Sequence, residues 1–506
     1  MSSQNFVTRP GSQFVQSGTG AVERTVESKL QDVVSVKDFG AVGDGVADDT
    51  AAIQAAIDFA CTSHRALYFP SSKPAFYYKI TSPLTITKPI SIYGEGPIST
   101  VLYAVGLTPG QYVLDFDCLA ADVVEHVTIQ DLTIRSSDGV PDGVLLKNVS
   151  YALLKNILLY NLYKGIVVDG TRCFTNTFEN INSYNITSNS IFFQANFTGG
   201  GHFTFLGCTF TGDTAVAVPS TAYLDNLCFE GCNWEQCVTN GLFIAGTCAG
   251  LSVTGCRTEG CNSTDFVLRP ALATEYVGGI NVVGNVFSAS DNGSVPRIQL
   301  GGSLGKIRGF SITGNVVTHG TDSFSSSLVE LNGDGESGLI AGNMLRGTAA
   351  SAVNTKRSGV IVYGNENLSG KLEEQWGASS WGVVEGTFTP TDGSGAGLSL
   401  TAAEGLYTKI GRMVFWQVFI SYPVNADATV AEFAGLPFAV GGLTGDTPGR
   451  SGATINVTNY GSSVGLLQGL NSGTTNVAFR DGTTGGSLTN ADISGKYFYC
   501  SGMYSI

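Results

Sequence analysis

Two glutamates in the middle of the chain stand at a spacing that suits acid–base chemistry. Glu235 and Glu259 are 24 residues apart, and the strings that contain them, NWE from Asn233 and RTE from Arg257, have the same layout. Hydrolysis of a glycosidic bond needs two carboxyl groups, one to protonate the leaving oxygen and one to act as nucleophile or base. We therefore treat Glu235 and Glu259 as candidate catalytic residues.

Three polar residues near the glutamates are candidates for substrate binding. Asn233 and Arg257 each precede a glutamate by two positions, so strand alternation points them to the same side as that glutamate. Arg257 suits an ionised partner or the carboxylate of a sugar. Asp213 follows the equivalent segment one repeat earlier. An alternative stays open for this group, because outward charged side chains on stacked strands are often solvated surface.

Other acidic residues compete for the same role. They are Asp169, Glu179, Glu230, Asp265, Glu330, Asp334 and Glu336. A lyase would instead need a base such as Lys, Arg, His or Tyr, and a cation or Ca²⁺ to neutralise a uronate. The sequence has only four histidines and contains no nucleophile elbow, phosphate loop or zinc signature. We therefore expect no serine esterase and no cofactor.

A short apolar segment that recurs at steps of 22 to 30 residues must position these side chains. Examples are FTFLGCTF from Phe203, LCFEGCNW from Leu227 and INVVGNVF from Ile280. When ten such segments are aligned, one column holds only Asp, Asn or Cys: Asp131, Asn156, Asn180, Cys208, Cys232, Cys256, Asn285, Asn315, Asn343 and Asn365. Variable steps around a constant strand–turn–strand are typical of a solenoid.

The aligned column has the properties of a tight bend in a stacked coil. Asn tolerates the left-handed backbone conformation, and a Gly precedes the column from Gly207 to Gly364. Stacked Asn side chains also hydrogen-bond from coil to coil. The three cysteines of the column are most simply small buried residues. The sequence therefore predicts a parallel β-helix over residues 126–370.

The position two past the column fixes which side chains face outward. It holds Phe210, Trp234 and Phe287, which are large and apolar and so point inward. The neighbouring positions, which include Glu235 and Glu259, then point outward. In the first three coils an apolar residue comes one past the column, so we expect this facing pattern only from Cys208 onward.

Composition and charge restrict the class of protein. Only 13% of residues are charged while Gly numbers 66, which favours short strands and tight turns over helices. The net charge of −14 argues against nucleic acid as a partner. No secretory signal or membrane-spanning apolar run is present, so we expect synthesis in a cytoplasm and no membrane partner.

The segment before the repeat carries a recognisable motif. VSVKDFGAVGDGVADDTAAIQAAID, followed by LYFP and ISIYGEG, closely resembles the N-terminal cap of the pectate-lyase-like superfamily, in the version carried by bacteriophage tailspikes and capsule depolymerases. Asp48, Asp49 and Thr50 are N-cap candidates for a helix that covers the end of the solenoid. Nearer the C-terminus, GLYTKIGRMVFWQVFI resembles a β-sandwich of phage tail fibres and spikes, which serves trimerisation or carbohydrate contact.

The resemblance implies an all-β protein with a right-handed parallel β-helix, a capping helix and a C-terminal antiparallel β-sandwich. The expected domains are an N-terminal anchor or adaptor peptide (1–33), the cap with the first irregular coils (34–125), the β-helix (126–370), a linker (371–385) and the β-sandwich (386–506).

The same resemblance implies a function and an assembly. It implies a homotrimeric tailspike in the phage virion, made in the host cytoplasm and attached to the phage tail or an adaptor protein through its N-terminus. Its expected activity is hydrolysis of a bacterial capsule, exopolysaccharide or O-antigen. A lyase of the same fold and a non-catalytic, receptor-binding adhesin remain the alternatives.

Overall fold

The computed structural model describes residues 12–505 with internal gaps. The gaps are 72–76, 120, 122, 196, 290–293, 303, 320–323, 334–336, 348–349, 355–358, 373–382, 411–412, 440–455, 459–466, 471–474 and 481–485. Most of the predicted linker and the first part of the predicted N-terminal peptide therefore lie outside the described residues. In the part of the chain that is described, no helix is long and apolar enough to cross a membrane.

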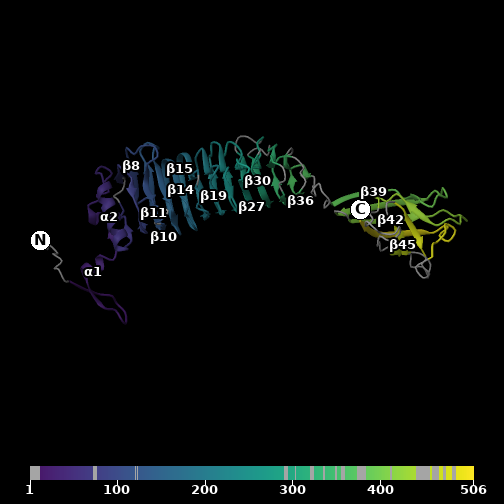
Figure 1. The fold of residues 1–506 in the computed structure, drawn as a ribbon, viewed down its shortest axis with the longest axis horizontal. Helices are drawn as coiled ribbons and strands as arrows, with labels where there is room; N and C mark the ends of the chain where they lie inside the picture. The colour runs from purple at the N-terminus through teal and green to yellow at the C-terminus, as the bar shows by residue number, and fades with distance from the viewer. Residues whose placement is uncertain are drawn as a thin grey trace. The chain divides into compact units, whose positions relative to one another are not determined.

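The chain divides into two compact units. The first comprises Met1–Lys356 and Val360–Glu374, and the second comprises Arg357–Gly359 and Gln375–Ile506. The first unit is a solenoid of parallel strands, and the second consists of antiparallel sheets (Figure 1). The predicted fold class is confirmed.

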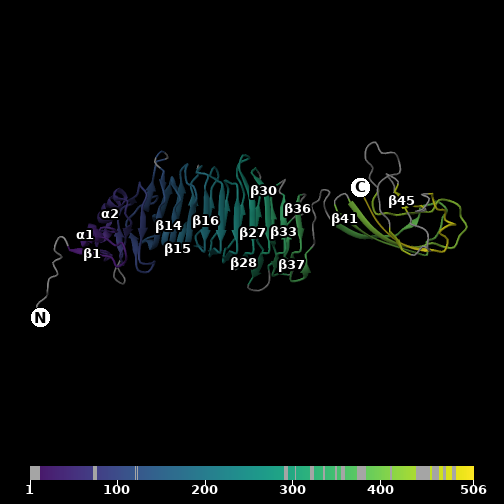
Figure 2. The ribbon, with the colours of Figure 1, turned by 90° about the horizontal axis from the view of Figure 1, so that it is seen from below.

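Parallel pairing from coil to coil builds the solenoid. In one row of strands each strand pairs with the next, in the order β11 (Thr128–Ser136), β14 (Leu153–Asp169), β15 (Asn176–Phe193), β16 (His202–Leu206), β20 (Asn226–Glu230), β24 (Leu251–Thr254), β27 (Tyr276–Val283), β30 (Lys306–Thr313), β33 (Gly338–Ala341) and β36 (Val360–Tyr363). Figure 2 shows these coils side by side along the unit. Their inward side chains form one continuous apolar core.

Each of these coils has a bend in the left-handed backbone conformation, which lies within the strand in β11, β14 and β15 and directly after the strand in the later coils. Asn180 adopts it in the third coil with φ 52°, and Gly207 adopts it in the fourth with φ 58°. The strands pair Glu179 with Leu206, so Asn180 lies beside Gly207 rather than beside Cys208. The predicted alignment is therefore wrong by one residue between the first three coils and the rest, because Asn and Gly both fill this bend.

The Asn column of the later coils forms a buried ladder. The side-chain Nδ2 of Asn285 donates to Oδ1 of Asn315 at 2.9 Å, and Asn315 and Asn343 repeat this bond to the next coil at 2.9 and 2.8 Å. The cysteines of the column are buried free thiols, as expected. In these later coils the buried Asn side chain at each bend is thus hydrogen-bonded to the Asn of the next coil.

The N-terminal end of the solenoid is covered by α2 (Thr50–Ser63) (Figure 1). Ile53, Ala56 and Ile57 of this helix are completely buried in the solenoid core. The helix begins where Asp48 accepts a hydrogen bond from the backbone N of Thr50 at 3.1 Å. The described part of the N-terminal peptide before it forms the hairpin of β1 (Gln13–Val15) and β2 (Glu23–Thr25), followed by α1 (Val26–Leu30).

The second unit packs two antiparallel sheets around their own core. The larger sheet has the order β39 (Val383–Phe388), β41 (Ala402–Ile410), β42 (Met413–Ser421), β47 (Tyr497–Ser505) and β44 (Asn456–Thr458). The smaller sheet has the order β40 (Thr391–Asp392), β43 (Glu432–Ala434), β46 (Val477–Arg480) and β45 (Leu467–Leu470). Trp416, Phe433 and Phe498 are buried in their shared core, as expected for a β-sandwich.

Candidate functional site

One coil of the solenoid is shorter than its neighbours at a single bend. Residues 182, 209 and 233 occupy the same position before the bend in three successive coils, and residues 191, 216 and 242 occupy the same position after it. The chain takes nine residue steps around the bend in 182–191, seven in 209–216 and nine again in 233–242. Because adjacent coils are held in register on both sides of this bend, the shorter one cannot reach as far outward. The bend of the middle coil is therefore recessed between two protruding bends.

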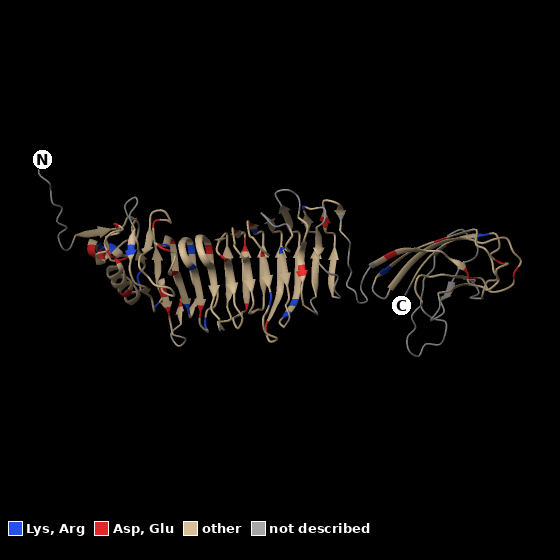
Figure 3. Ribbon diagram, turned by 90° about the horizontal axis from the view of Figure 1, so that it is seen from above, with Lys and Arg blue, Asp and Glu red and all other residues tan. Residues whose placement is uncertain are grey.

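A groove of about 360 Å³ lies at this recess. Residues 184–187 of β15 line one side, residues 211–213 line the recessed part, and Glu235, Gln236 and Val238 line the other side. Charged residues are sparse along the solenoid (Figure 3). The groove nevertheless contains two carboxyl groups, those of Asp213 and Glu235, together with the ring of Tyr184.

Asp213 is held in place by the following coil. Its carboxylate Oδ1 accepts a hydrogen bond from the hydroxyl of Thr239, and its backbone O accepts one from the backbone N of Thr239 at 2.7 Å. The side chain is otherwise exposed to solvent. The sequence placed Asp213 among the substrate-binding candidates, and the structure sets it in the groove beside Glu235.

Glu235 is the last residue of strand β21 (Asn233–Glu235), and it directly follows Trp234, whose side chain points into the core. Asn233 on the same strand donates a hydrogen bond from Nδ2 to Oε1 of Glu235. Asn233 therefore contacts the glutamate, and this bond fixes the direction of the carboxylate. Glu235 is half-buried, in keeping with its position at the side of a groove.

Glu259 lies directly beside Glu235 on strand β25 (Arg257–Glu259), in the register expected from the sequence. Its side chain is 53% exposed, and its Oε2 is 3.0 Å from Nη2 of Arg257. Neither residue of this ion pair lines the groove. The structure thus brings Glu235 together with two acids, with Glu259 along the sheet and with Asp213 in the recessed part of the groove.

Buried hydroxyl groups support the recessed bend from inside. Ser183 and Ser190 lie 2.6 Å apart through their hydroxyl oxygens, and both accept hydrogen bonds from the backbone N of Thr211. The neighbouring Gly212 has φ 132°, and a Cβ atom there would lie 2.6 Å from the backbone O of Ser188. The recess therefore requires glycine at this position.

The competing acid Asp265 is buried inside the solenoid. Its Oδ2 lies 3.4 Å from Nη1 of Arg297, and both side chains are only 1% exposed. Burial raises the pKa of Asp265 to about 6, against the attraction of Arg297. Such an internal pair has no access to a polymer, so Asp265 does not serve as a surface acid.

The other competing acids lie elsewhere. Asp169, Glu179, Glu230 and Glu330 do not line the groove, and Asp334 and Glu336 fall outside the described residues. Glu179 is paired with Lys155 at 2.8 Å, and Glu330 accepts a hydrogen bond from Gln299 at 2.7 Å. These contacts are those of ordinary surface side chains.

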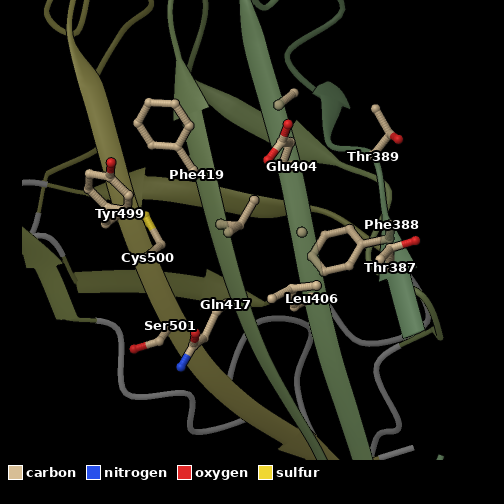
Figure 4. A pocket seen from close by; sticks show the side chains of 13 residues that line it. Thr387, Phe388, Thr389, Glu404, Leu406, Gln417, Phe419, Tyr499, Cys500 and Ser501 are labelled. Atoms are coloured by element: carbon tan, nitrogen blue, oxygen red, sulfur yellow. The ribbon is translucent and has the colours of Figure 1, made fainter. Parts of the chain in front are cut away.

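A larger hollow, of about 600 Å³, lies on the five-stranded sheet of the second unit. Figure 4 shows the rings of Phe419 and Tyr499 at one side of it, with Gln417 and Ser501 nearby. The two ring centroids are 4.6 Å apart. Its lining has one carboxyl group, that of Glu404, so it lacks the acid pair that hydrolysis requires.

A family model described as "Rhamnogalacturonase A/epimerase, pectate lyase-like" matches residues 33–262. This segment includes the capping helix and every residue of the groove.

Curated relatives match shorter segments of this chain, whereas a solved structure is similar over nearly all of it. The tail spike protein of Shigella phage Sf6 is 31% identical over 164 residues, which is 28% of this chain and 26% of that protein. The mannuronan C5-epimerase AlgE2 of Azotobacter vinelandii is 43% identical over 79 residues, 14% of this chain and 8% of that protein. The chain therefore spans about a quarter or less of these relatives' length. The Dettilon tailspike protein is similar over 95% of this chain and 96% of that chain, with 15% identity and a TM-score of 0.45.

Proposed function

We propose that this chain, a pectate-lyase-like parallel β-helix protein related to phage tailspikes, recognises and depolymerises a bacterial surface polysaccharide by hydrolysis. The observation that carries the proposal is the groove at the recessed bend. It combines two carboxyl groups with an exposed aromatic ring, which suits stacking against a sugar and acid–base cleavage beside it.

Glu235 is the central carboxyl group of the proposed mechanism. One carboxyl protonates the glycosidic oxygen while the other attacks the sugar or activates a water molecule. The sequence pairs Glu235 with Glu259, and the groove offers Asp213 as the second carboxyl. We favour Asp213, because Glu259 is already paired with Arg257 outside the groove lining. In this mechanism Asn233 positions Glu235, and Arg257 remains a candidate contact for an acidic sugar.

A lyase acting on a uronic-acid polymer is the second candidate. The observation that favours it is the phenol of Tyr184 in the groove, since a tyrosine can remove the proton that a lyase abstracts. No described histidine side chain lines the groove. A binding-only adhesin is the third candidate and requires no acid chemistry at all.

The test uses purified capsular polysaccharides and O-antigens from a panel of bacterial strains. Release of reducing ends without a gain in ultraviolet absorbance is expected for a hydrolase, whereas a lyase also produces an absorbing unsaturated sugar. A glycan that is bound but not cleaved by either measure supports the adhesin.

We also propose an assembly and a place in the virion. The chain forms a homotrimer whose N-terminal residues 1–33 attach it to the phage tail or an adaptor protein. Residues 386–506 serve trimerisation, carbohydrate contact or both. Exposed apolar side chains on the larger sheet, including Leu406, Phe415 and Met503, support contact with another copy, because such side chains are costly to leave in water.

A further inference from the structure

An aromatic row runs along the first coils of the solenoid toward the groove. Tyr103 on β8 (Val101–Ala104) pairs with Arg135, Arg135 pairs with Tyr160, and Tyr160 pairs with Tyr184. The four residues therefore occupy the same position in four consecutive coils, about 4.8 Å apart. We call Tyr103, Arg135, Tyr160 and Tyr184 the tyrosine track.

The residues of the track point outward. Their chain neighbours Ile134, Leu159 and Ser183 are completely buried, so strand alternation directs the track residues to the surface. Tyr160 is 39% exposed and Tyr184 is 43% exposed. Each ring thus presents an apolar face and a hydroxyl group to solvent.

Arg135 restrains the rings at the N-terminal end of the tyrosine track. Its guanidinium carbon lies 5.1 Å from the ring centroids of Tyr77 and Tyr103 and 5.3 Å from that of Tyr160. It also donates a hydrogen bond to the hydroxyl of Tyr77 at 3.4 Å. A cation among three rings restrains them, so less conformational entropy is lost when a ligand stacks on them.

The track and the groove share Tyr184. This residue is the last member of the row and also lines the groove with Asp213 and Glu235. A polymer that stacks on Tyr160 and Tyr184 in turn would continue directly to the two carboxyl groups. The tyrosine track therefore begins in the first coils and ends at the groove.

We infer that the tyrosine track is an extended binding site for the polysaccharide, and that the sugar chain lies along the solenoid axis with its cleaved bond in the groove. The inference rests on the proposed function for its ligand, and it adds where the glycan lies and which residues bind it. Tyr160 and Tyr184 supply the stacking faces, and Arg135 supplies a cation for an acidic sugar.

The experiment measures binding, so that it does not depend on cleavage. Tyr160→Thr and Tyr184→Thr remove a ring but keep a residue that favours strands. Tyr363→Thr is the matched control, because Tyr363 is also 39% exposed and lies on β36, far along the solenoid. Each change is made in the Glu235→Gln background. The probes are the panel polysaccharides that the protein retains and size-fractionated fragments of them made by partial acid hydrolysis.

We expect both track variants to bind long fragments about tenfold more weakly than the Tyr363→Thr control. For Tyr160→Thr the loss should disappear with fragments short enough to fill only the groove. Equal binding of long fragments by all three variants, with unchanged melting temperatures, would overturn the inference.

The remaining outcomes separate the inference from the proposed function. If the wild-type protein cleaves no polysaccharide but the track variants lose binding, the hydrolase is wrong and the track stands. If it cleaves a polysaccharide while the variants bind it normally, the hydrolase stands and the track is wrong. A protein that neither binds nor cleaves any glycan of the panel contradicts both.

Discussion

Glu235 owes its direction to one neighbour on its own strand. Asn233 donates a hydrogen bond to its carboxylate, while Asp213 accepts one from the hydroxyl of Thr239 in the following coil. Each acid of the proposed pair thus has one positioning residue, and neither forms an ion pair in the described part of the chain. This leaves both carboxyl groups open to a substrate.

The identity of the second carboxyl can be tested at the residue scale. We expect Asp213→Asn to lower kcat by about 10²- to 10⁴-fold, because it removes an acid or base that contacts the reacting atoms. Glu259→Gln should change kcat only a few-fold, since Glu259 lies outside the groove lining. The measurement is the rate of reducing-end release from a polysaccharide that the wild type cleaves.

Glu230→Gln is the control for this comparison, because Glu230 is an exposed acid that does not line the groove. The opposite order of effects, with Glu259→Gln inactive and Asp213→Asn active, would assign the second carboxyl to Glu259 as the sequence predicted.

The sequence pointed to the acidic residues that line the groove but not to the aromatic residue beside them. Glu235 and Asp213 follow from counting along the repeat, because an apolar residue such as Trp234 fixes which side chains face inward. Tyr184 was missed, because the facing pattern was expected only from Cys208 onward. The catalytic roles themselves stay predictions.

At the scale of the element, the recurring bend explains both the success and the error of the alignment. One backbone conformation is filled by Asn180 in one coil and by Gly207 in the next, with nearly equal φ angles. Aligning the coils by residue type therefore introduces a shift of one residue between them, although the bend lies at the same place in both coils. The recess was hidden as well, because the steps from Cys208 to Cys232 and from Cys232 to Cys256 are both 24 residues long, although the first contains the seven-step bend and the second a nine-step bend.

The buried Asn ladder makes a prediction about stability. Oδ1 of Asn315 accepts hydrogen bonds from the backbone N and from Nδ2 of Asn285, at 3.0 and 2.9 Å. Asn315→Ala would leave the backbone N–H of Asn285 and one of the two N–H groups of its Nδ2 buried and unpaired, while the other N–H group still donates to the backbone O of Val253. Each lost acceptor costs about 1–3 kcal/mol in the free energy of unfolding. We expect a clear fall in the melting temperature.

Asn281→Ala, at an exposed position of the neighbouring strand β27, is the control for the ladder and should melt like the wild type. Equal melting temperatures for Asn315→Ala and Asn281→Ala would show that the ladder contributes nothing to stability.

At the scale of the whole molecule, the two units have different surfaces. The solenoid carries its exposed tyrosines in a row that leads to an acid-lined groove. The larger sheet of the second unit instead exposes Leu406, Phe415, Met503 and Tyr499 on neighbouring strands. The first surface suits a polymer, and the second suits contact with another protein copy. The fold class of both units was predictable from the sequence, because strand patterns and bends are local.

The proposed trimer is tested by light scattering coupled to size exclusion at micromolar protein concentration. We expect a mass three times that of the 52.8 kDa chain. Leu406→Glu together with Phe415→Glu should lower that mass, because charges on the exposed face oppose its burial. A stable monomer of the wild-type chain would contradict the proposed trimer. It would not affect the groove, because all of its lining residues come from one chain.

The central claim is that the groove around Glu235 cleaves a bacterial polysaccharide. The most direct measurement compares wild type and Glu235→Gln on the strain panel, and records reducing ends, ultraviolet absorbance and glycan retention. We predict that the wild type releases reducing ends without a gain in absorbance, and that Glu235→Gln retains the same glycan but no longer cleaves it. Full cleavage by Glu235→Gln, or an absorbance gain with the wild type, would contradict the account.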